Sequence, residues 1–264
     1  MLQINNIYKT FNIGTINEKH ALNGINLHLN KGDFVTVIGG NGAGKSTMLN
    51  AISGVWPVDA GQIIIDGTNV TKLPEYKRAS YLGRVFQDPM IGTAANMEIQ
   101  ENLALALRRG QTRTLKWNIT AKERENYREL LKTLDLGLEN RLTTKVGLLS
   151  GGQRQALTLL MATLTQPKLL LLDEHTAALD PKTAAKVLEI SDRIIAEQEL
   201  TALMVTHNMR DAIAHGNRLI MLKDGKVILD IGGEEKKNLT VEMLLAKFAT
   251  VSGEELASDR MLLS

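Results

Sequence analysis

One segment of this chain, residues 39–47, constrains the fold more than any other, because its sequence GGNGAGKST matches the phosphate-loop pattern G-x-x-x-x-G-K-[ST] in full. The apolar, β-branched stretch at 33–38 precedes it and predicts a strand, and residues 48–52 follow it with helical periodicity. A glycine-rich turn that carried a lysine by chance would require neither neighbour. The order of strand, loop and helix therefore predicts an α/β domain with a phosphate-binding loop.

The residue types of this loop explain how it would hold a nucleotide. Glycines allow the backbone to curl until successive N–H groups point inward and form an anion-binding nest, and a helix that begins near Gly44 adds its positive end. We expect Lys45 to reach the β- and γ-phosphates and the Ser46 hydroxyl to ligate Mg²⁺. The predicted nucleotide-binding residues of the loop are Gly39, Asn41, Gly42, Ala43, Gly44, Lys45, Ser46 and Thr47.

The composition limits the classes of protein to consider. The 264 residues are 44% hydrophobic and 23% charged, which suits one or two compact domains with a sizeable core. A formal net charge of +2 favours neither nucleic acid nor an anionic membrane as a partner, since either would require clustered basic residues. The absence of cysteine excludes disulfides and thiolate metal sites and fits a reducing cytosol. No signal peptide is visible, and apolar runs such as 169–172 are too short to span a bilayer. If the protein serves a membrane, we therefore expect it to do so as a peripheral subunit.

Strands alternate with helices along most of the chain, which implies a largely parallel sheet. The predicted strands cover residues 2–5, 22–29, 62–67, 81–87, 169–173 and 201–206, with a hairpin of 219–223 and 226–231 around Asp224-Gly225. The predicted helices cover 96–109, 120–135 (with Thr120 and Glu123 as a capping box), 181–199, 208–215 and 241–248. A polar loop is expected at 110–118, and 136–148 reads as short and irregular. Residues 88–150 are therefore predicted to be a mainly helical insertion in a domain of residues 1–232, followed by a short helical extension at 233–264.

Two carboxylates follow the apolar strand that begins at residue 169. Asp173 and Glu174 stand at its carboxyl end, where ligands bind in open parallel sheets. Asp173 is placed to hold Mg²⁺ through water, and Glu174 to polarise an attacking water molecule as general base. A core strand that ends in an ordinary acidic turn would look the same in isolation, and the phosphate loop is what favours the catalytic interpretation.

A second helix N-terminus is predicted from residues 149–155, which read LSGGQRQ. Ser150 is a good N-cap, and Gly151 and Gly152 leave the following N–H groups approachable, so this terminus is another phosphate-binding device. One nucleotide is hard to reach from both devices if the helical insertion holds them apart. Both can meet on one nucleotide when two copies of the chain associate head to tail. The alternative is an ordinary glycine-rich N-cap.

With these motifs the chain resembles the ATP-binding subunit of ABC transporters over about residues 1–230. Residues 149–153 are identical to the family signature LSGGQ, residues 39–47 correspond to its Walker A loop, and Asp173 and Glu174 to the end of Walker B. The resemblance implies an α/β P-loop NTPase (RecA-like) core with a mostly parallel sheet, an N-terminal antiparallel β subdomain and an inserted α-helical subdomain. It also implies ATP and Mg²⁺ as cofactors.

The resemblance assigns roles to residues outside these motifs. Gln87 corresponds to the Q-loop glutamine, which touches the Mg²⁺ and water region and faces the permease, and Asp180 to the D-loop at the dimer interface. His207 corresponds to the switch histidine on the γ-phosphate, and Phe11 to an adenine-stacking aromatic residue, with Tyr8 as the alternative. Without that context Gln87 would be a polar strand end, His207 a histidine with satisfied hydrogen bonds, and Phe11 a core aromatic residue. The signature residues expected to contact the nucleotide of a second copy are Ser150, Gly151, Gly152 and Gln153.

His175 departs from the family pattern, in which proline usually follows the Walker B glutamate. Without the proline the turn towards the D-loop is expected to loosen, and a histidine beside the carboxylate could titrate near neutral pH. We expect His175 to be a solvated residue of this turn. The string DEHTAALD at 173–180 is similar to the ATPases of bacterial import systems that work with an amino-acid-binding lipoprotein, in some cases for tryptophan or tyrosine.

The resemblance therefore predicts a peripheral ATPase on the cytoplasmic face of the cell membrane that powers import of a small solute, an amino acid. The expected partners are a second copy in a head-to-tail homodimer, integral membrane permease subunits and an extracytoplasmic substrate-binding lipoprotein, but no nucleic acid. Residues 88–107 are the expected permease contact, and the basic stretch at 108–117 is either part of it, a lipid contact or a solvated face.

Other functions of the family stay open at this point. An exporter or lipoprotein-release ATPase fits the same motifs. A DNA-repair ATPase fits less well because residues 88–150 hold no sustained heptads, and a translation ATPase would carry two cassettes. A regulatory cassette that only binds nucleotide is disfavoured by the intact set of Lys45, Asp173, Glu174 and His207.

Overall fold

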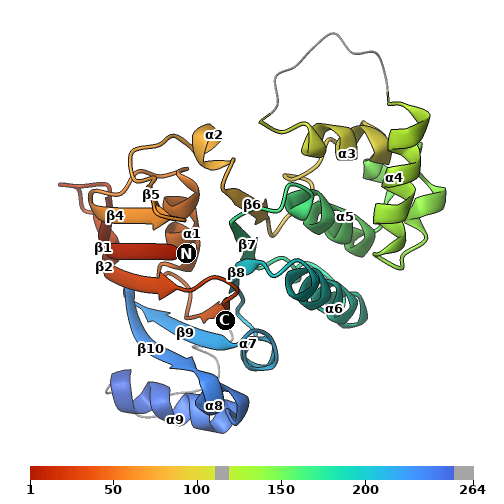
Figure 1. Ribbon diagram of the computed structural model, residues 1–264. Helices are drawn as coiled ribbons and strands as arrows, with labels where there is room; N and C mark the ends of the chain where they lie inside the picture. The colour runs from red at the N-terminus through yellow and green to blue at the C-terminus, as the bar shows by residue number, and fades with distance from the viewer. Residues whose placement is uncertain (111–118, 253–264) are drawn as a thin grey trace.

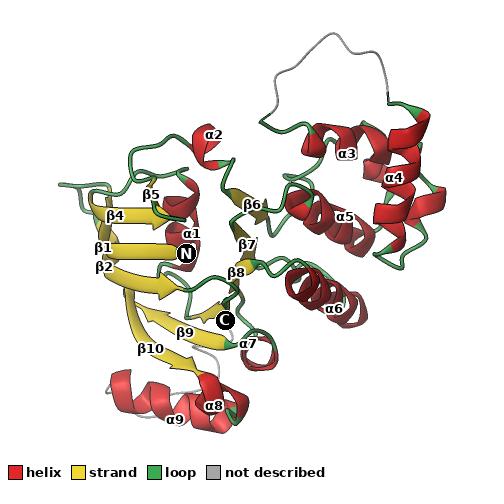
Figure 2. Ribbon diagram, viewed as in Figure 1, coloured by secondary structure: helices red, strands yellow, loops and turns green. Residues whose placement is uncertain are grey.

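The computed structural model describes residues 1–110 and 119–252, and its strands form two sheets (Figures 1 and 2). The strands are β1 (Leu2–Phe11), β2 (Lys19–Leu29), β3 (Phe34–Ile38), β4 (Ala60–Ile65), β5 (Thr68–Asn69), β6 (Leu82–Val85), β7 (Leu169–Asp173), β8 (Thr201–Val205), β9 (Arg218–Lys223) and β10 (Lys226–Gly232). An antiparallel sheet has the order β2-β1-β4-β5. The second sheet has the order β10-β9-β3-β8-β7-β6, and its strands pair in parallel except for β10. The predicted fold class is confirmed.

Helices follow most of the parallel strands. They are α1 (Lys45–Ser53), α2 (Glu75–Arg78), α3 (Ile99–Leu107), α4 (Ala121–Lys132), α5 (Gly151–Thr163), α6 (Pro181–Glu197), α7 (Met209–Ala214), α8 (Gly233–Lys237) and α9 (Val241–Ser252), with single turns of 3-10 helix at Leu138–Asn140 and Val146–Leu148. The segment between β6 and β7 holds α3, α4 and α5, and these helices stand apart from the antiparallel sheet (Figure 2). None of the helices in the described ranges is long and apolar enough to cross a bilayer.

The strands of the second sheet bring three loops to one edge. β3 pairs with β8 and β8 with β7, and the register sets Val37 opposite Val205 and Val205 opposite Asp173. The segments that follow these strands therefore leave the sheet side by side, because parallel strands end at the same edge. They are the phosphate loop after β3, Glu174 after β7 and His207 after β8.

Two cores cover the two faces of this sheet. On one face Leu169 and Leu171 of β7 pack with α1 and with the antiparallel sheet, so α1 lies between the two sheets. On the other face Leu170 and Leu172 pack with α5 and α6. Side chains of a strand alternate between faces, and the four consecutive leucines of β7 are the pattern of a strand that is buried on both faces. Helices α1 and α5 therefore lie on opposite faces of the six-stranded sheet (Figure 1).

Most predicted elements appear within two residues of their expected ends, and the differences have local causes. β1 runs on to Phe11 instead of ending at residue 5, because Asn6 takes a positive φ of 51° and the strand continues beyond a register shift. α3 begins at Ile99 rather than 96, since Glu98 and Glu101 form a capping box there. The polar loop predicted at 110–118 lies outside the described residues except for Gly110, as does most of the basic stretch at 108–117.

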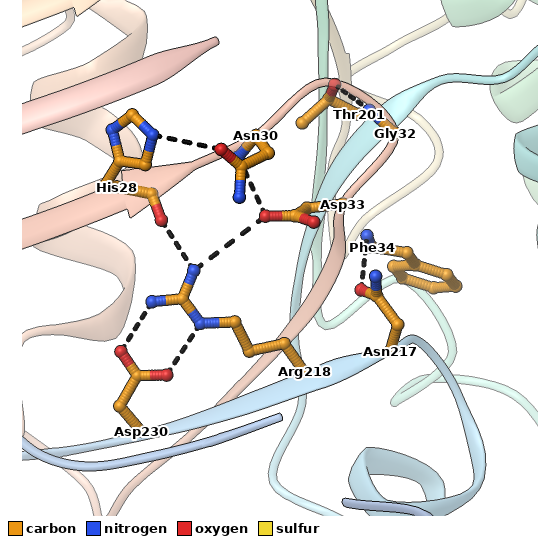
Figure 3. A network of polar contacts seen from close by, with 9 residues as sticks. All are labelled: His28, Asn30, Gly32, Asp33, Phe34, Thr201, Asn217, Arg218 and Asp230. Carbon is orange, nitrogen blue, oxygen red and sulfur yellow. Dashed lines mark hydrogen bonds and ion pairs between the residues drawn. The ribbon is translucent and has the colours of Figure 1, made fainter. Parts of the chain in front are cut away.

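An arginine clamp joins the two sheets near the start of β3, where Arg218 lies opposite Val35 (Figure 3). Arg218 of β9 donates Nε–H and Nη2–H to the two carboxylate oxygens of Asp230 on β10, at 2.6 and 2.5 Å. Its Nη1 donates to the His28 carbonyl of β2 at 2.6 Å and lies 3.9 Å from Asp33. Such a bidentate pair fixes geometry as well as energy, so the clamp ties β9 to β10 and both strands to the end of β2.

Two buried cations donate to the carbonyl groups at helix ends, and neither has an acidic partner among residues 1–110 and 119–252. Arg78 is 2% exposed and donates to the carbonyls of Ala51 and Ile52 at the end of α1 and to those of Thr71 and Leu73. Lys236 is 4% exposed and donates to the Ala212, Ile213 and His215 carbonyls at the end of α7. Burial lowers the pKa of both groups. The second contact fastens the chain beyond β10 to the sheet domain, together with Leu239 and Leu244, which pack in a core with Met209.

Candidate functional site

The phosphate loop has the backbone that its glycines predict. Gly39 and Gly44 have φ values of 151° and 103°, in the region that side chains rarely adopt. A Cβ atom at Gly39 would lie 2.3 Å from the Leu222 carbonyl oxygen, and one at Gly44 would lie 2.6 Å from that of Ala21. The loop is thus pressed between β2 and β9, and no larger residue fits at either position.

Lys45 is the first residue of α1 and is buried. Its ammonium group donates to the Gly39 carbonyl at 2.6 Å and to that of Gly40 at 3.3 Å, so the side chain folds back over the loop. Burial lowers the pKa of Lys45, whereas Glu174 and Asp173 act to raise it. The exposed Ser46 follows on α1, and the helix N-terminus offers its N–H groups on the same side. This arrangement can bind a polyphosphate.

Asp173 pairs with a cation that the sequence did not single out. Arg84 of β6 places Nη2 3.0 Å from Asp173 Oδ2 and Nη1 3.1 Å from the Ser53 hydroxyl, and its guanidinium carbon lies 4.6 Å from the centre of the Phe86 ring. Both partners of the ion pair are largely shielded, with side chains 12% and 14% exposed. The sequence signal that could have pointed to this ion pair was a charged residue, Arg84, inside the otherwise apolar strand at 82–85.

Glu174 and His207 meet beside this pair. Glu174 has a φ of 44°, a left-handed conformation that is strained for a residue other than glycine, and strain of this kind is concentrated at functional sites. Its N–H donates to the Val205 carbonyl at 3.0 Å, which extends the β7–β8 ladder by one residue. His207 Nδ1 lies 3.7 Å from Glu174 Oε2, and 53% of the histidine side chain is exposed. A carboxylate and an imidazole thus stand side by side at the edge of the sheet where the phosphate loop follows β3.

The donor set at this edge fits magnesium bound together with a nucleotide. Asp173 and the Ser46 hydroxyl are oxygen ligands, which Mg²⁺ prefers. Among residues 1–110 and 119–252 no group of three or more His, Cys, Asp or Glu side chains could hold a metal by itself. Mg²⁺ usually keeps several waters and binds through one or two protein groups and the phosphates of a substrate, so a complete protein cage is not required.

The signature segment forms a separate helix N-terminus. The Ser150 hydroxyl accepts from the Gln153 N–H at 3.3 Å, and the Gln153 side chain accepts from the Ser150 N–H at 3.3 Å, which is a capping box at the start of α5. Gly151 is exposed and Gly152 is buried. Because α5 and α1 lie on opposite faces of the sheet, one chain does not bring this terminus and the phosphate loop together on one side.

The other predicted site residues occupy three further places. Gln87 is exposed and follows β6. Asp180 is the N-cap of α6, and hydrogen bonds from Thr183 hold the pKa of its carboxyl below the usual value. Phe11 ends β1, with its ring edge-on to Trp56 at 4.9 Å. The alternative, Tyr8, is 37% exposed on the same strand.

The expectation for His175 was wrong. The side chain is 2% exposed rather than solvated, and its Nε2 lies 3.0 Å from the Ser191 hydroxyl on α6. Burial, with a smaller contribution from His215, lowers the pKa of His175 to about 4, so it does not titrate near neutral pH. A single sequence gave no signal of this packing, because the contact lies with the middle of a helix that begins after the turn.

Comparisons with known proteins agree with this geometry. Residues 22–177 match the family model described as ABC transporter. The chain is 49% identical to a tyrosine transport ATP-binding protein of Clostridioides difficile (strain R20291), over 94% of this chain and 98% of that protein. It is 35% identical to the choline transport ATP-binding protein OpuBA of Bacillus subtilis, over 86% of this chain but only 56% of that protein.

A solved structure shares the fold. The ATP-binding cassette MJ0796, determined as a dimer in a post-hydrolysis state with ADP and phosphate, superposes with a TM-score of 0.74. It is 31% identical, over 88% of this chain and 98% of that one. The phosphate loop, the strained glutamate at the end of β7 and the separate signature helix thus stand in a fold shared with an ATP-binding cassette. The chain belongs to the ABC transporter family, as one of its ATP-binding cassettes.

Proposed function

We propose that this cassette hydrolyses ATP to power import of an amino acid, of the tyrosine class, through a separate membrane permease. The observation that carries the hydrolysis is the convergence of Lys45, Asp173, Glu174 and His207 at one edge of the sheet. The support for the cargo is the 49% identity to a tyrosine transport ATP-binding protein, together with the similarity of residues 173–180 to amino-acid import ATPases.

Each of these residues has a part in the reaction. Lys45 exchanges the Gly39 carbonyl for the β- and γ-phosphate oxygens, which relieves the cost of a partly buried ammonium group. Glu174 accepts a proton from the attacking water, and His207 donates a hydrogen bond to the γ-phosphate. Asp173 and the Ser46 hydroxyl would hold Mg²⁺, which would supply positive charge beside the phosphates. Catalysis in this scheme is positioning and electrostatics rather than covalent chemistry.

Two copies complete each site. In a head-to-tail homodimer, Ser150 to Gln153 of one copy would close over the phosphate loop of the other, with Asp180 at the interface and Phe11 stacking on adenine. The separation of α1 and α5 in one chain supports this arrangement. A variant that stays monomeric should then bind ATP normally and barely hydrolyse it, and full turnover by a strictly monomeric form would overturn the scheme.

The permease would contact the surface after the Q-loop. Gln87 leads into it, and Met90, Ile91 and Leu105 are large apolar residues that are 42%, 66% and 48% exposed. This surface would place the chain on the cytoplasmic face of the membrane, with an extracytoplasmic binding lipoprotein supplying the amino acid. An exporter of the same family is the alternative. Uptake of labelled tyrosine into right-side-out vesicles that contain ATP and carry the permease and lipoprotein separates the two, because in this orientation an exporter would not accumulate it.

The test of the catalytic assignment is Glu174→Gln. Loss of the base should abolish most hydrolysis, while ATP-dependent dimerisation persists because the loop and signature are intact. The readouts are phosphate release and size-exclusion chromatography with ATP. Wild-type turnover by this variant would refute the assignment of the general base.

A further inference from the structure

The segment after Glu174 is anchored to α6 by one buried side chain. His175 is 2% exposed and Ser191 is fully buried, and the His175 Nε2 and Ser191 Oγ atoms are 3.0 Å apart. The Ser191 hydroxyl lies 2.8 Å from the Val187 carbonyl and donates its single proton there. Ser191 Oγ must therefore accept from His175, which assigns the proton of the neutral imidazole to Nε2.

The histidine is neutral at neutral pH, because its pKa is about 4. Burial is the main cause of its low pKa, and the nearby Asp192, which favours the charged form, does not compensate. Asp192 is instead engaged by His215, whose Nδ1 lies 2.7 Å from its carboxylate. The contact between His175 and Ser191 is thus a neutral, dry hydrogen bond, which holds geometry and contributes no charge to the site.

The backbone that this contact fixes is strained. Glu174 has a φ of 44° and is clamped on one side by its own N–H, which donates to the Val205 carbonyl. On the other side its carbonyl accepts from the Ala177 N–H at 3.0 Å. A left-handed residue other than glycine persists only where its surroundings impose the conformation. If the chain after it were free, Glu174 would relax to a negative φ and its carboxylate would leave His207.

We propose that His175 is a positioning residue for ATP hydrolysis: its buried hydrogen bond to Ser191 locks the turn that presents the Glu174 carboxylate to the reacting water. This rests on the proposed role of Glu174 as general base. The anchor replaces, with a side chain, the rigidity that a proline would give this turn through its ring. It acts on the chemical step and leaves the phosphate loop and the signature untouched.

The test compares four variants of the full chain by steady-state ATP hydrolysis. His175→Phe fills the space without a donor, and Ser191→Ala removes the acceptor. Each variant is expected to lower kcat about tenfold and to change KM for ATP by less than about twofold, because a misplaced carboxylate affects the reacting geometry rather than ATP binding. His175→Gln offers an N–H at the place of Nε2 and is expected to restore kcat to within about threefold. Thr163→Val removes a buried hydroxyl of α5 that donates to Leu159 O, and serves as a control with unchanged kcat.

The outcomes separate the positioning role from the assignment of the base. Urea unfolding of each variant identifies any that lose the fold, and Ser191→Ala, the smallest change, then decides. If Glu174→Gln is inactive but His175→Phe and Ser191→Ala keep wild-type kcat, the positioning role is refuted and the base stands. If Glu174→Gln turns over normally, both fail. A loss of kcat in His175→Phe that His175→Gln does not repair also refutes the hydrogen bond as its cause.

Discussion

Gly152 of the signature is required by the fold as well as by any nucleotide contact, and alanine substitution separates the two. A Cβ atom on Gly152 would lie 2.0 Å from Thr183 Cγ2 on α6. A Cβ atom on the neighbouring Gly151 would meet Leu179 Cδ2 at 3.2 Å, a contact that a small shift of that side chain relieves. The two glycines are therefore a matched pair, one buried against a helix and the other exposed.

The size of the effect follows from the distance. Carbon atoms in contact stand roughly 3.5–4.0 Å apart, so α5 and α6 must separate by about 1.5 Å or Thr183 must change rotamer. Overpacking of this kind lowers the free energy of unfolding by about 1–3 kcal/mol. The better helix propensity of alanine offsets roughly 0.5–1 kcal/mol of this loss. The midpoints of these ranges leave a net cost of about 1 kcal/mol, so we expect Gly152→Ala to lower the free energy of unfolding by about 1 kcal/mol, and Gly151→Ala by less than about 0.5 kcal/mol.

The assay is urea unfolding of the nucleotide-free chain, followed by circular dichroism. Thr183→Ser removes the clashing methyl group and keeps the backbone N–H that donates to Asp180. The double variant Gly152→Ala/Thr183→Ser should therefore be about 1 kcal/mol more stable than the sum of the single changes predicts, since residues in contact are not additive. Wild-type stability of Gly152→Ala, or a strictly additive double variant, would refute the steric reasoning.

Three further predictions concern stability. Arg78→Met leaves four carbonyls without their donor and should lower the free energy of unfolding by about 2–4 kcal/mol in urea. Lys236→Met should leave the free energy of unfolding of the sheet domain unchanged but make the chain beyond β10 sensitive to limited proteolysis. The reason is that the three carbonyls at the end of α7 lose their donor. Hydrogen bonds from Thr120, then from Arg108, lower the pKa of Glu123 to about 2. Since the pKa of Glu123 is lower in the folded than in the unfolded state, its stabilisation is present above about pH 4.5 and is lost towards pH 2. With a third of the side chain exposed, this stabilisation is about 1 kcal/mol. The amide exchange rate of α4 in Glu123→Gln should therefore exceed that of the wild type at pH 7 and equal it near pH 2.

Local signals account for the parts of the fold that were predicted well. The capping residues Thr120 and Ser150 start α4 and α5 where the sequence predicts, because an N-cap side chain acts within three residues of itself. The phosphate loop and the strand before Asp173 were equally local, since their residue types determine their conformation.

Contacts between distant segments account for the parts that were missed. Whether a histidine in a turn is solvated depends on what faces it, and Ser191 of α6 faces His175. Arg84 and Asp173 lie on neighbouring strands, β6 and β7, that are separated in sequence by the whole helical segment. A sequence shows which residues can form an ion pair or a buried hydrogen bond but not which of them the sheet order will bring together.

The place of β3 in its sheet affects how the chain can fold during synthesis. β3 is made early, yet its neighbours β8 and β9 come from the last quarter of the sequence. The antiparallel sheet is complete in sequence by Asn69 and can form first. The strand that carries the phosphate loop, in contrast, gains both partners only when β9 has left the ribosome. Until then ATP has no assembled site on the nascent chain, and the apolar β3 waits for its strand partners over most of translation.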